Sequence, residues 1–121
     1  AIIHGANIGK NVLVGMNTVI MDDAEIGDES IIGAMSFVKA ETVIPKRSLV
    51  VGNPAKVVKE VSDEMINWKT KGTKLYQQLP ADCQESLKEV EPLRKVPKNQ
   101  KMQESFYDTF REFLQGQESH E

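Results

Sequence analysis

An aliphatic residue occupies every sixth position from Ile2 to Val50 of this 121-residue chain, and a mostly small residue lies two places before nearly every one. A repeat of short, fixed period predicts a solenoid. A period of six is typical of a left-handed parallel β-helix, in which each repeat forms one side of a triangular coil. We therefore expect a mainly β fold with α, with about three coils over residues 1–58 and then C-terminal helices. The aliphatic series is Ile2, Ile8, Val14, Ile20, Ile26, Ile32, Val38, Ile44 and Val50; the small series is Ala6, Val12, Thr18, Ala24, Ser30, Ser36, Thr42 and Ser48.

The outer surface of such a coil divides into three faces, because side chains alternate along a strand and residues 18 apart stack. Two faces are apolar and the third is more polar. Contiguous apolar patches mark interfaces, so we expect the C-terminal helix to cover one and a neighbouring subunit to cover the other. A corner with Met16 and Met35 is a candidate trimer contact, or else supports the helix. The faces consist of Leu13, Ile31 and Leu49; of Ala1, Val19 and Phe37; and of Asn7, Glu25 and Val43.

Residues 59–121 are predicted to form a helical extension. Ser62 is a good N-cap, and the acidic residues that follow suit a first helical turn. Pro80 is expected to break or restart this helix, with a second helix over 81–90 and an extended linker over 91–100. A third, Phe-rich helix is expected over 102–114. The residues expected to face inward are Met65, Trp68, Gly72, Leu75, Tyr76 and Leu79 in the first helix and Cys83, Leu87 and Val90 in the second.

Composition limits the classes of function. The chain has 15 basic and 18 acidic residues and no dense basic block, so we expect no nucleic-acid partner. Its single cysteine, Cys83, excludes an intrachain disulfide and a cysteine-based zinc site. Without a long apolar segment or a signal peptide, we expect a cytoplasmic protein that does not enter a membrane. The repeat is already in phase at Ala1, without a cap, which predicts the C-terminal portion of a longer protein.

His4 is the one histidine within the repeats, and it lies at a predicted corner. On the residues alone, such a histidine is more often structural or solvated than a ligand. His120 lies in a polar tail and is expected to be solvated. A single ordered histidine cannot hold zinc, because catalytic zinc sites commonly use three protein ligands. Taken alone, these residues support a scaffold and no reaction.

A resemblance to a known family changes this interpretation. Residues 4–16, HGANIGKNVLVGM, are similar to the HGxxIGxNxLIGM run of the γ-carbonic-anhydrase-like hexapeptide proteins, and residues 30–34 and 50–58 continue the similarity. Residues 68–76 and 89–93 resemble the subgroup that contains the phenylacetic acid degradation protein and the carnitine operon protein. The resemblance covers roughly residues 1–96.

This resemblance implies a homotrimer with a zinc or similar ion held between subunits by three histidines. His4 takes the position of one ligand. A second ligand would lie five residues before it and the third further upstream, both outside this chain. Tyr76 matches a tyrosine near the pocket, where it could orient water or substrate, although helix packing is an equal alternative. Asn53 and Lys56 could contact an acyl-CoA, although a structural turn is the simpler interpretation.

The implied function is metal-dependent hydrolysis. A zinc-type ion lowers the pKa of bound water toward about 7. The resemblance favours an acyl-CoA thioesterase of phenylacetate or carnitine metabolism, and carbon dioxide hydration is a second possibility for the same site. Two other classes stay open. One is a non-catalytic trimeric scaffold or accessory subunit, and the other is a hexapeptide acyltransferase. Acyltransferases of this type usually extrude a loop that carries a catalytic histidine, whereas residues 2–50 hold their register without an insertion.

Overall fold

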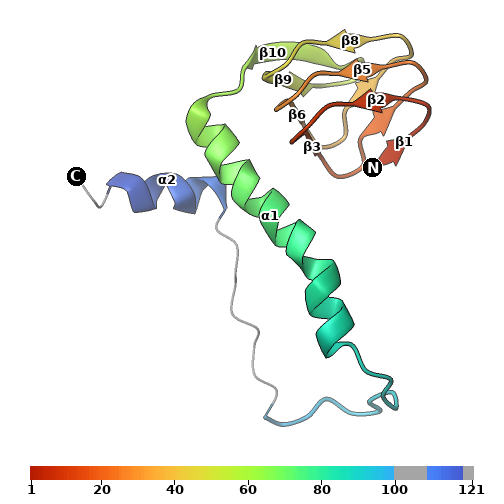
Figure 1. Ribbon diagram of the computed structural model, residues 1–121, viewed down its shortest axis with the longest axis vertical. Helices are drawn as coiled ribbons and strands as arrows, with labels where there is room; N and C mark the ends of the chain where they lie inside the picture. Colours follow the sequence, from red (N-terminus) through yellow and green to blue (C-terminus); the bar gives the residue numbers. More distant parts are fainter. Residues whose placement is uncertain (100–108, 119–121) are drawn as a thin grey trace. The chain divides into compact units, whose positions relative to one another are not determined.

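A computed structural model describes residues 1–99 and 109–118 of the chain. Nine short strands wind into three coils and stack in three parallel sheets, β1-β4-β7, β2-β5-β8 and β3-β6-β9, with β10 antiparallel to β9 (Figure 1). The predicted left-handed β-helix is confirmed. The strands are β1 Ile2–Ile3, β2 Asn7–Ile8, β3 Leu13–Val14, β4 Val19–Ile20, β5 Glu25–Ile26, β6 Ile31–Ile32, β7 Phe37–Val38, β8 Val43–Ile44, β9 Ser48–Val51 and β10 Lys56–Glu60.

The chain divides into two compact units, Ala1–Thr70 and Lys71–Glu121. The division falls inside helix α1, Asp63–Ser86, whereas the predicted boundary after residue 58 falls within β10. The first unit holds the β-helix and the first two turns of α1. The described part of the second unit holds the rest of α1 and helix α2, Phe110–Glu118.

The core of the β-helix consists of the two repeating series. Buried hydroxyl groups of the small series find hydrogen-bond partners on the backbone, as buried polar groups generally must. The Thr18 hydroxyl donates to the Gly33 carbonyl at 3.0 Å, and the Ser30 hydroxyl donates to the Pro45 carbonyl at 3.0 Å. The small residues therefore fill the corners and also tie successive corners together. The buried apolar cluster comprises Ile20, Ala24, Ile26, Ile32, Val38, Ile44 and Val50.

The backbone repeats with the same period as the side chains. One residue in each turn adopts the left-handed conformation, with φ between 51° and 63°. Asn and Asp tolerate this conformation best among non-glycine residues, but here Glu, Met and Arg adopt it too. The coil packing therefore imposes the turn geometry on residues that do not prefer it. The series is Gly5, Asn11, Asn17, Asp23, Glu29, Met35, Glu41 and Arg47.

The first strand departs from the predicted register. Ile2 pairs with Val19, and Ile3 pairs with Ile20. Ile3, and not Ile2, therefore continues the inward-pointing aliphatic series. Ile2 takes the outward position next to Val19 that was predicted for Ala1. The predicted places of Ile2 and Ala1 were therefore wrong. The reason is the length of the first turn: residues 4–6 join β1 to β2, whereas residues 21–24 join the equivalent strands of the next coil. The first turn is thus one residue shorter.

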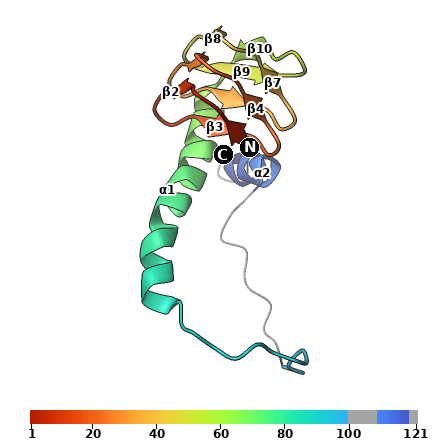
Figure 2. The same cartoon turned by 90° about the vertical axis from the view of Figure 1, so that its right-hand side faces the viewer.

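The outer face of the sheet β3-β6-β9 is covered within the first unit. Ile31 points away from the buried cluster yet is only 6% exposed. At the start of β3, the Asn11 side chain donates to the Thr70 hydroxyl at 2.9 Å and the Lys69 ammonium donates to the Asn11 carbonyl. These contacts place the beginning of α1 beside β3 (Figure 2) and account for the burial of Ile31. The C-terminal helix therefore covers one apolar face, as predicted; a subunit over the other stays a prediction.

The passage from β10 to α1 is fixed by a cap and an ion pair. The Ser62 hydroxyl accepts a hydrogen bond from the Met65 N–H at 3.3 Å, which confirms Ser62 as the N-cap. The Arg47 guanidinium donates to the Asp63 carboxylate and to the Val61 carbonyl. The hydrogen bond to Asp63 is the main cause of the raised pKa of Arg47. A turn of the β-helix thus holds the first turn of α1.

Helix α1 runs through Pro80 to Ser86 without a break, so the prediction of two separate helices was wrong. Proline removes one helical N–H donor, but the helix is exposed from Tyr76 onward, where water can bond the freed carbonyl. The expected inward positions of the second helix were also wrong: Cys83 is exposed, and Leu87 and Val90 are 80% and 78% exposed. In the first helix Gly72 is buried as predicted, but Tyr76 and Leu79, also predicted to face inward, are 74% and 40% exposed, and Lys69 is buried although it was not in the predicted set.

Helix α2 begins with a capping box. The Thr109 hydroxyl donates to the Glu112 carboxylate at 2.7 Å and accepts from the Glu112 N–H at 3.3 Å. The hydrogen bond from the Thr109 hydroxyl lowers the pKa of Glu112. The ring of Phe113 is stacked on that of Phe110 with centroids 6.4 Å apart, and the Lys71 ammonium lies 4.6 Å from the Phe113 centroid. The predicted helix over 102–114 lies partly outside the described residues, and α2 extends past its predicted end, to Glu118.

Burial makes Lys69 a source of pH-dependent stability. Its side chain is 1% exposed, and desolvation lowers the pKa of its ammonium group below the ordinary value of 10.5, although the Glu29 carboxylate opposes this. The folded state therefore loses this proton at lower pH than the unfolded state, so stability rises with pH until the unfolded lysine also deprotonates.

We expect the urea midpoint of the wild-type protein to rise relative to that of Lys69→Met as the pH increases toward 10.5, the ordinary pKa of lysine. Lys74→Met removes an exposed ammonium group and serves as the control, whose midpoint should follow the wild type. Parallel pH profiles for the wild type and Lys69→Met would contradict the prediction.

Candidate functional site

His4 and Asp22 form a side-chain pair on neighbouring coils. The Nδ1 atom of His4 lies 2.7 Å from Oδ1 of Asp22, and the two side chains are 75% and 49% exposed. His4 belongs to the turn after β1, and Asp22 to the turn after β4. A carboxylate only accepts hydrogen bonds, so it selects the neutral imidazole with its hydrogen on Nδ1. The Nε2 atom then carries the lone pair and is available to a ligand or a proton.

The approach of this carboxylate depends on Gly5. A Cβ atom on Gly5 would lie 2.5 Å from Asp22 Oδ1, a distance at which the carboxylate must move. Gly5 also has a φ of 61°, which a glycine adopts without strain. The turn between β1 and β2 therefore leaves room for the Asp22 carboxylate directly beside His4.

Sequence reasoning missed Asp22, although a signal was available. The residue lies 18 positions after His4, the spacing that an unbroken repeat predicts for one coil, although the register of β1 is 17 residues and the backbone counterpart of His4 is Met21. Searching for polar residues one coil away from the candidate histidine finds it at once. Asp22 is the addition that the structure makes to the predicted site.

The described residues do not complete a metal site. Within residues 1–99 and 109–118 no group of three or more His, Cys, Asp and Glu side chains could hold an ion. The His4 imidazole fits the role of one ligand, since its side chain is 75% exposed and its Nδ1 atom is bound to a carboxylate. It does not by itself fit a zinc ion, which needs further ligands.

The other predicted site residues lie apart from this pair. Asn53 is exposed in the turn after β9, and Lys56 is exposed at the start of β10. Within the part of the chain that the structure describes, neither shares a hydrogen bond or ion pair with His4 or Asp22. Tyr76 is 74% exposed on α1, in the second unit. Their roles in a site stay predictions.

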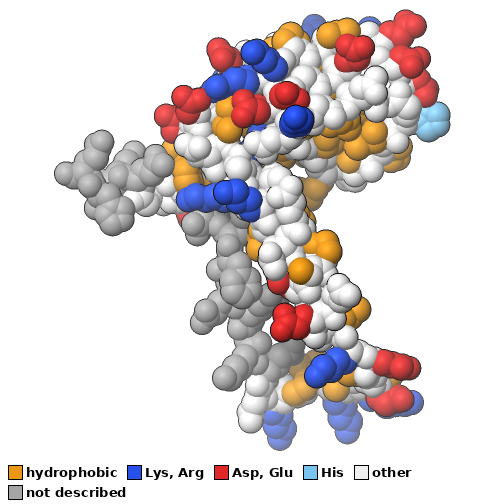
Figure 3. Space-filling view, viewed as in Figure 1, with side chains coloured by type: hydrophobic (Ala, Val, Ile, Leu, Met, Phe, Trp, Pro, Cys, Tyr) orange, Lys and Arg blue, Asp and Glu red, His pale blue; other side chains and the backbone are white. Residues whose placement is uncertain are grey.

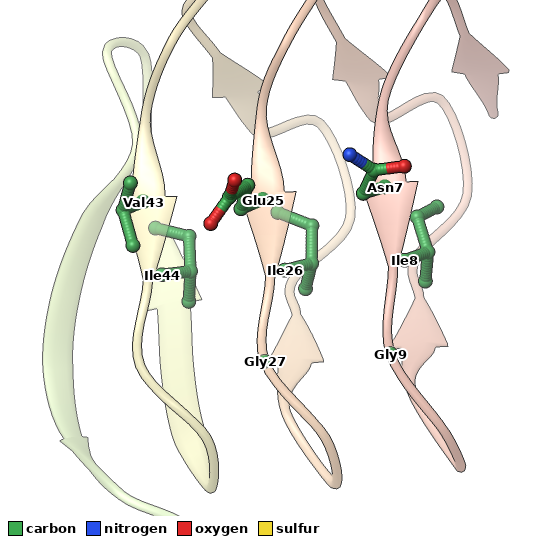
Figure 4. A pocket seen from close by; sticks show the side chains of 8 residues that line it. All are labelled: Asn7, Ile8, Gly9, Glu25, Ile26, Gly27, Val43 and Ile44. Carbon is green, nitrogen blue, oxygen red and sulfur yellow. The ribbon is translucent and has the colours of Figure 1, made fainter.

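A shallow groove of about 390 Å³ crosses the third face of the β-helix. Figure 4 shows Asn7, Glu25 and Val43 pointing to one side of their strands and the isoleucines pointing to the other. The groove is lined by the β2-β5-β8 sheet, which begins directly after the His4 turn. Its lining is polar at Asn7 and Glu25 and apolar at Val43, the more mixed face that the repeat predicts.

The surface carries charges of both signs. On the face drawn in Figure 3, acidic and basic side chains are interspersed over the β-helix. Among the described helices, none is long and apolar enough to cross a membrane.

Comparison with known proteins places the repeats among related sequences. Residues 5–40 match the bacterial transferase hexapeptide family (six repeats). Over 99 residues the chain is 53% identical to the carnitine operon protein CaiE of Escherichia coli K12, an alignment that covers 82% of this chain and 50% of CaiE. The chain is therefore similar to CaiE along most of its length, and its residues 5–40 match the hexapeptide family. It spans about half the length of the curated relatives it matches.

Two solved structures share this hexapeptide-repeat fold. The product of the Bacillus cereus BC4754 gene, assigned as an acetyltransferase, is 34% identical with a TM-score of 0.67, over 69% of this chain and 48% of that one. A hexapeptide transferase family protein of Anaplasma phagocytophilum is 29% identical with a TM-score of 0.59, over 66% and 48%. The homology to CaiE confirms the carnitine operon part of the predicted resemblance. The γ-carbonic-anhydrase-like and phenylacetic acid parts stay predictions.

Proposed function

We propose that this chain is the C-terminal part of a trimeric, metal-dependent hydrolase that acts on an acyl-CoA thioester. The observation that carries the proposal is the His4 imidazole, which is exposed, bound through Nδ1 to Asp22, and without a partner at Nε2 among residues 1–99 and 109–118. Metal-ligating histidines characteristically donate their other ring N–H to a carboxylate or carbonyl. His4 would supply one ligand, and residues outside the described chain or in a neighbouring subunit would supply the others.

The contribution of this chain's own residues is positional. When bound, a zinc-type ion would supply activated water at neutral pH. Asp22 holds the His4 ring through Nδ1, which leaves Nε2 of this exposed side chain as the nitrogen for an ion. No hydrolytic step follows from the described residues alone, because they hold one of the ligands. Roles for Asn53, Lys56 and Tyr76 toward an acyl-CoA belong to the same proposal, and the CaiE relationship favours carnitine metabolism as its setting.

A second candidate is acyl transfer from CoA to a hydroxyl or amine acceptor. It is favoured by the match of residues 5–40 to a transferase family and by the similarity to the Bacillus cereus protein. In that reaction His4 would act as the general base, with Asp22 holding it in the required tautomer. Against it, residues 2–50 form their coils without a protruding loop.

The experiment measures metal content and CoA release in the intact protein. We expect about one metal ion per subunit and release of CoA from an arylacetyl-CoA or a carnitine-derived acyl-CoA without an added acceptor. His4→Ala should lower the rate at least about 100-fold, whereas His120→Ala, which removes the other histidine, should not. Metal-free protein that releases CoA only with an acceptor would indicate acyl transfer. Equal rates for wild type and His4→Ala would leave the scaffold alternative.

A further inference from the structure

We infer that Asp22 is a positioning residue that fixes the His4 tautomer, and that the shortened Gly5 turn is the device that brings the two side chains together. The inference rests on the proposed role of His4 as the reactive side chain. Three independent features of the first turn support it: its length, the backbone pairing of His4, and the space at Gly5.

The length of the turn changes which residue His4 faces. The His4 N–H donates to the Ile20 carbonyl at 3.0 Å, just as the Met21 N–H donates to the Val38 carbonyl at 3.1 Å. The backbone of His4 thus occupies the place that Met21 has one coil later. With one residue fewer in its turn, however, the His4 side chain reaches Asp22 and not Met21. A turn of the usual length would stack His4 differently.

Glycine at position 5 is explained by the carboxylate and not by backbone conformation. Met35, Glu41 and Arg47 adopt the same left-handed φ elsewhere in the coil, so that φ alone does not require glycine. What distinguishes position 5 is Asp22 Oδ1, which lies 2.5 Å from where a Cβ would be. The Asp23 N–H also donates to the Gly5 carbonyl at 2.8 Å, which holds the two turns together.

The chemical consequence is a single defined tautomer. A neutral imidazole has one donor nitrogen and one acceptor nitrogen. Because the Asp22 carboxylate accepts from Nδ1–H, the acceptor is Nε2, the nitrogen that a ligand or an acidic proton can reach. The neighbouring Asp23 is exposed and its side chain makes no hydrogen bond within the described residues, so it offers a matched carboxylate without this role.

The test reads the tautomer directly by long-range ¹H–¹⁵N NMR on the ¹⁵N-labelled chain. His120→Gln in the background leaves His4 as the one imidazole, because the chain has two histidines. At about pH 9, where an ordinary imidazole is neutral, we expect a protonated Nδ1 and an unprotonated Nε2. Asp22→Asn should convert most of the population to the Nε2–H form, as loss of the equivalent carboxylate does in a catalytic triad. Asp23→Asn should leave the spectrum of His4 unchanged.

Gly5→Ala provides the second variant, since it keeps both partners but displaces the carboxylate. It should shift the tautomer in the same direction as Asp22→Asn; if it fails to fold, Asp22→Asn decides alone. In the intact enzyme, Asp22→Asn should lower kcat about 10- to 100-fold with KM unchanged.

Two results would overturn the inference: a hydrogen on Nε2 in the wild type, or the same tautomer in wild type and Asp22→Asn. A shifted tautomer with an unchanged rate of CoA release would instead uphold the positioning of His4 and refute the part of the proposed function in which His4 takes part in the reaction.

Discussion

Gly27→Ala is expected to destabilise the β-helix by about 3 kcal/mol or more, because overpacking against fixed backbone costs at least as much as overpacking among side chains. A Cβ at Gly27 would lie 2.4 Å from the Lys46 nitrogen and 2.7 Å from its Cα. Neither atom belongs to a flexible side chain. If the two coils moved apart to make room for the Cβ, the hydrogen bond from the Gly27 N–H to the Ile44 carbonyl, which is 2.8 Å long, would also be stretched. The substitution therefore disturbs the stacking of two coils.

The urea midpoint of the purified chain, followed by circular dichroism, measures this effect. Gly116→Ala is the matched control, since its added Cβ meets nothing within 4 Å and a helical alanine replaces glycine with a gain of up to about 1 kcal/mol. We expect a large fall in the midpoint for Gly27→Ala and no fall for Gly116→Ala. A Gly27→Ala protein with the wild-type midpoint would show that the coils can separate without loss of stability.

Ile31→Glu should also cost about 3 kcal/mol or more, because it buries a carboxylate without a partner. The position points outward, but it is only 6% exposed beneath the start of α1. Val43→Glu makes the same chemical change at the equivalent outward position of another face, where the side chain is 66% exposed. At that position we expect the free energy of unfolding to change by no more than about 0.5 kcal/mol.

Comparing the two variants separates two effects on stability: the loss of packing beneath α1, and the intrinsic preference of a strand for isoleucine or valine over glutamate. Urea midpoints at neutral pH give the difference, and native-state hydrogen exchange in α1 should rise in Ile31→Glu alone. Equal midpoints would mean that α1 does not cover the β3-β6-β9 face in solution.

The repeat predicted the coil, the inward series and the N-cap because each depends on local spacing. It failed at the first strand for a physical reason. Ile2 and Ile3 are both aliphatic, so the pattern cannot distinguish which of them points inward, and the length of the turn that follows decides it. The prediction of two helices around Pro80 failed for a different reason. Proline is a strong local signal, but it removes only one helical N–H donor, and here the freed carbonyl can bond water because this part of α1 is exposed.

The candidate site was half predictable. The resemblance indicated His4, and a search 18 residues further on points to Asp22, although the register of the structure at β1 is 17 residues. What the sequence alone could not provide was the contact itself, since it requires both a shortened turn and an open space above Gly5. Among the described residues no group of three or more His, Cys, Asp and Glu side chains could hold an ion, so the further ligands of the proposed metal site stay a prediction.

The short first turn has a wider meaning for a protein built by repetition. In a regular solenoid each residue lies over its own counterpart, and in this chain the inward counterparts are all aliphatic or nearly all small. Regularity therefore favours a uniform column of like side chains over a reactive pair. Omitting one residue from one turn offsets the column, and an imidazole then meets a carboxylate. A repeat protein can therefore gain a pair of interacting polar side chains through one turn that departs from the repeat.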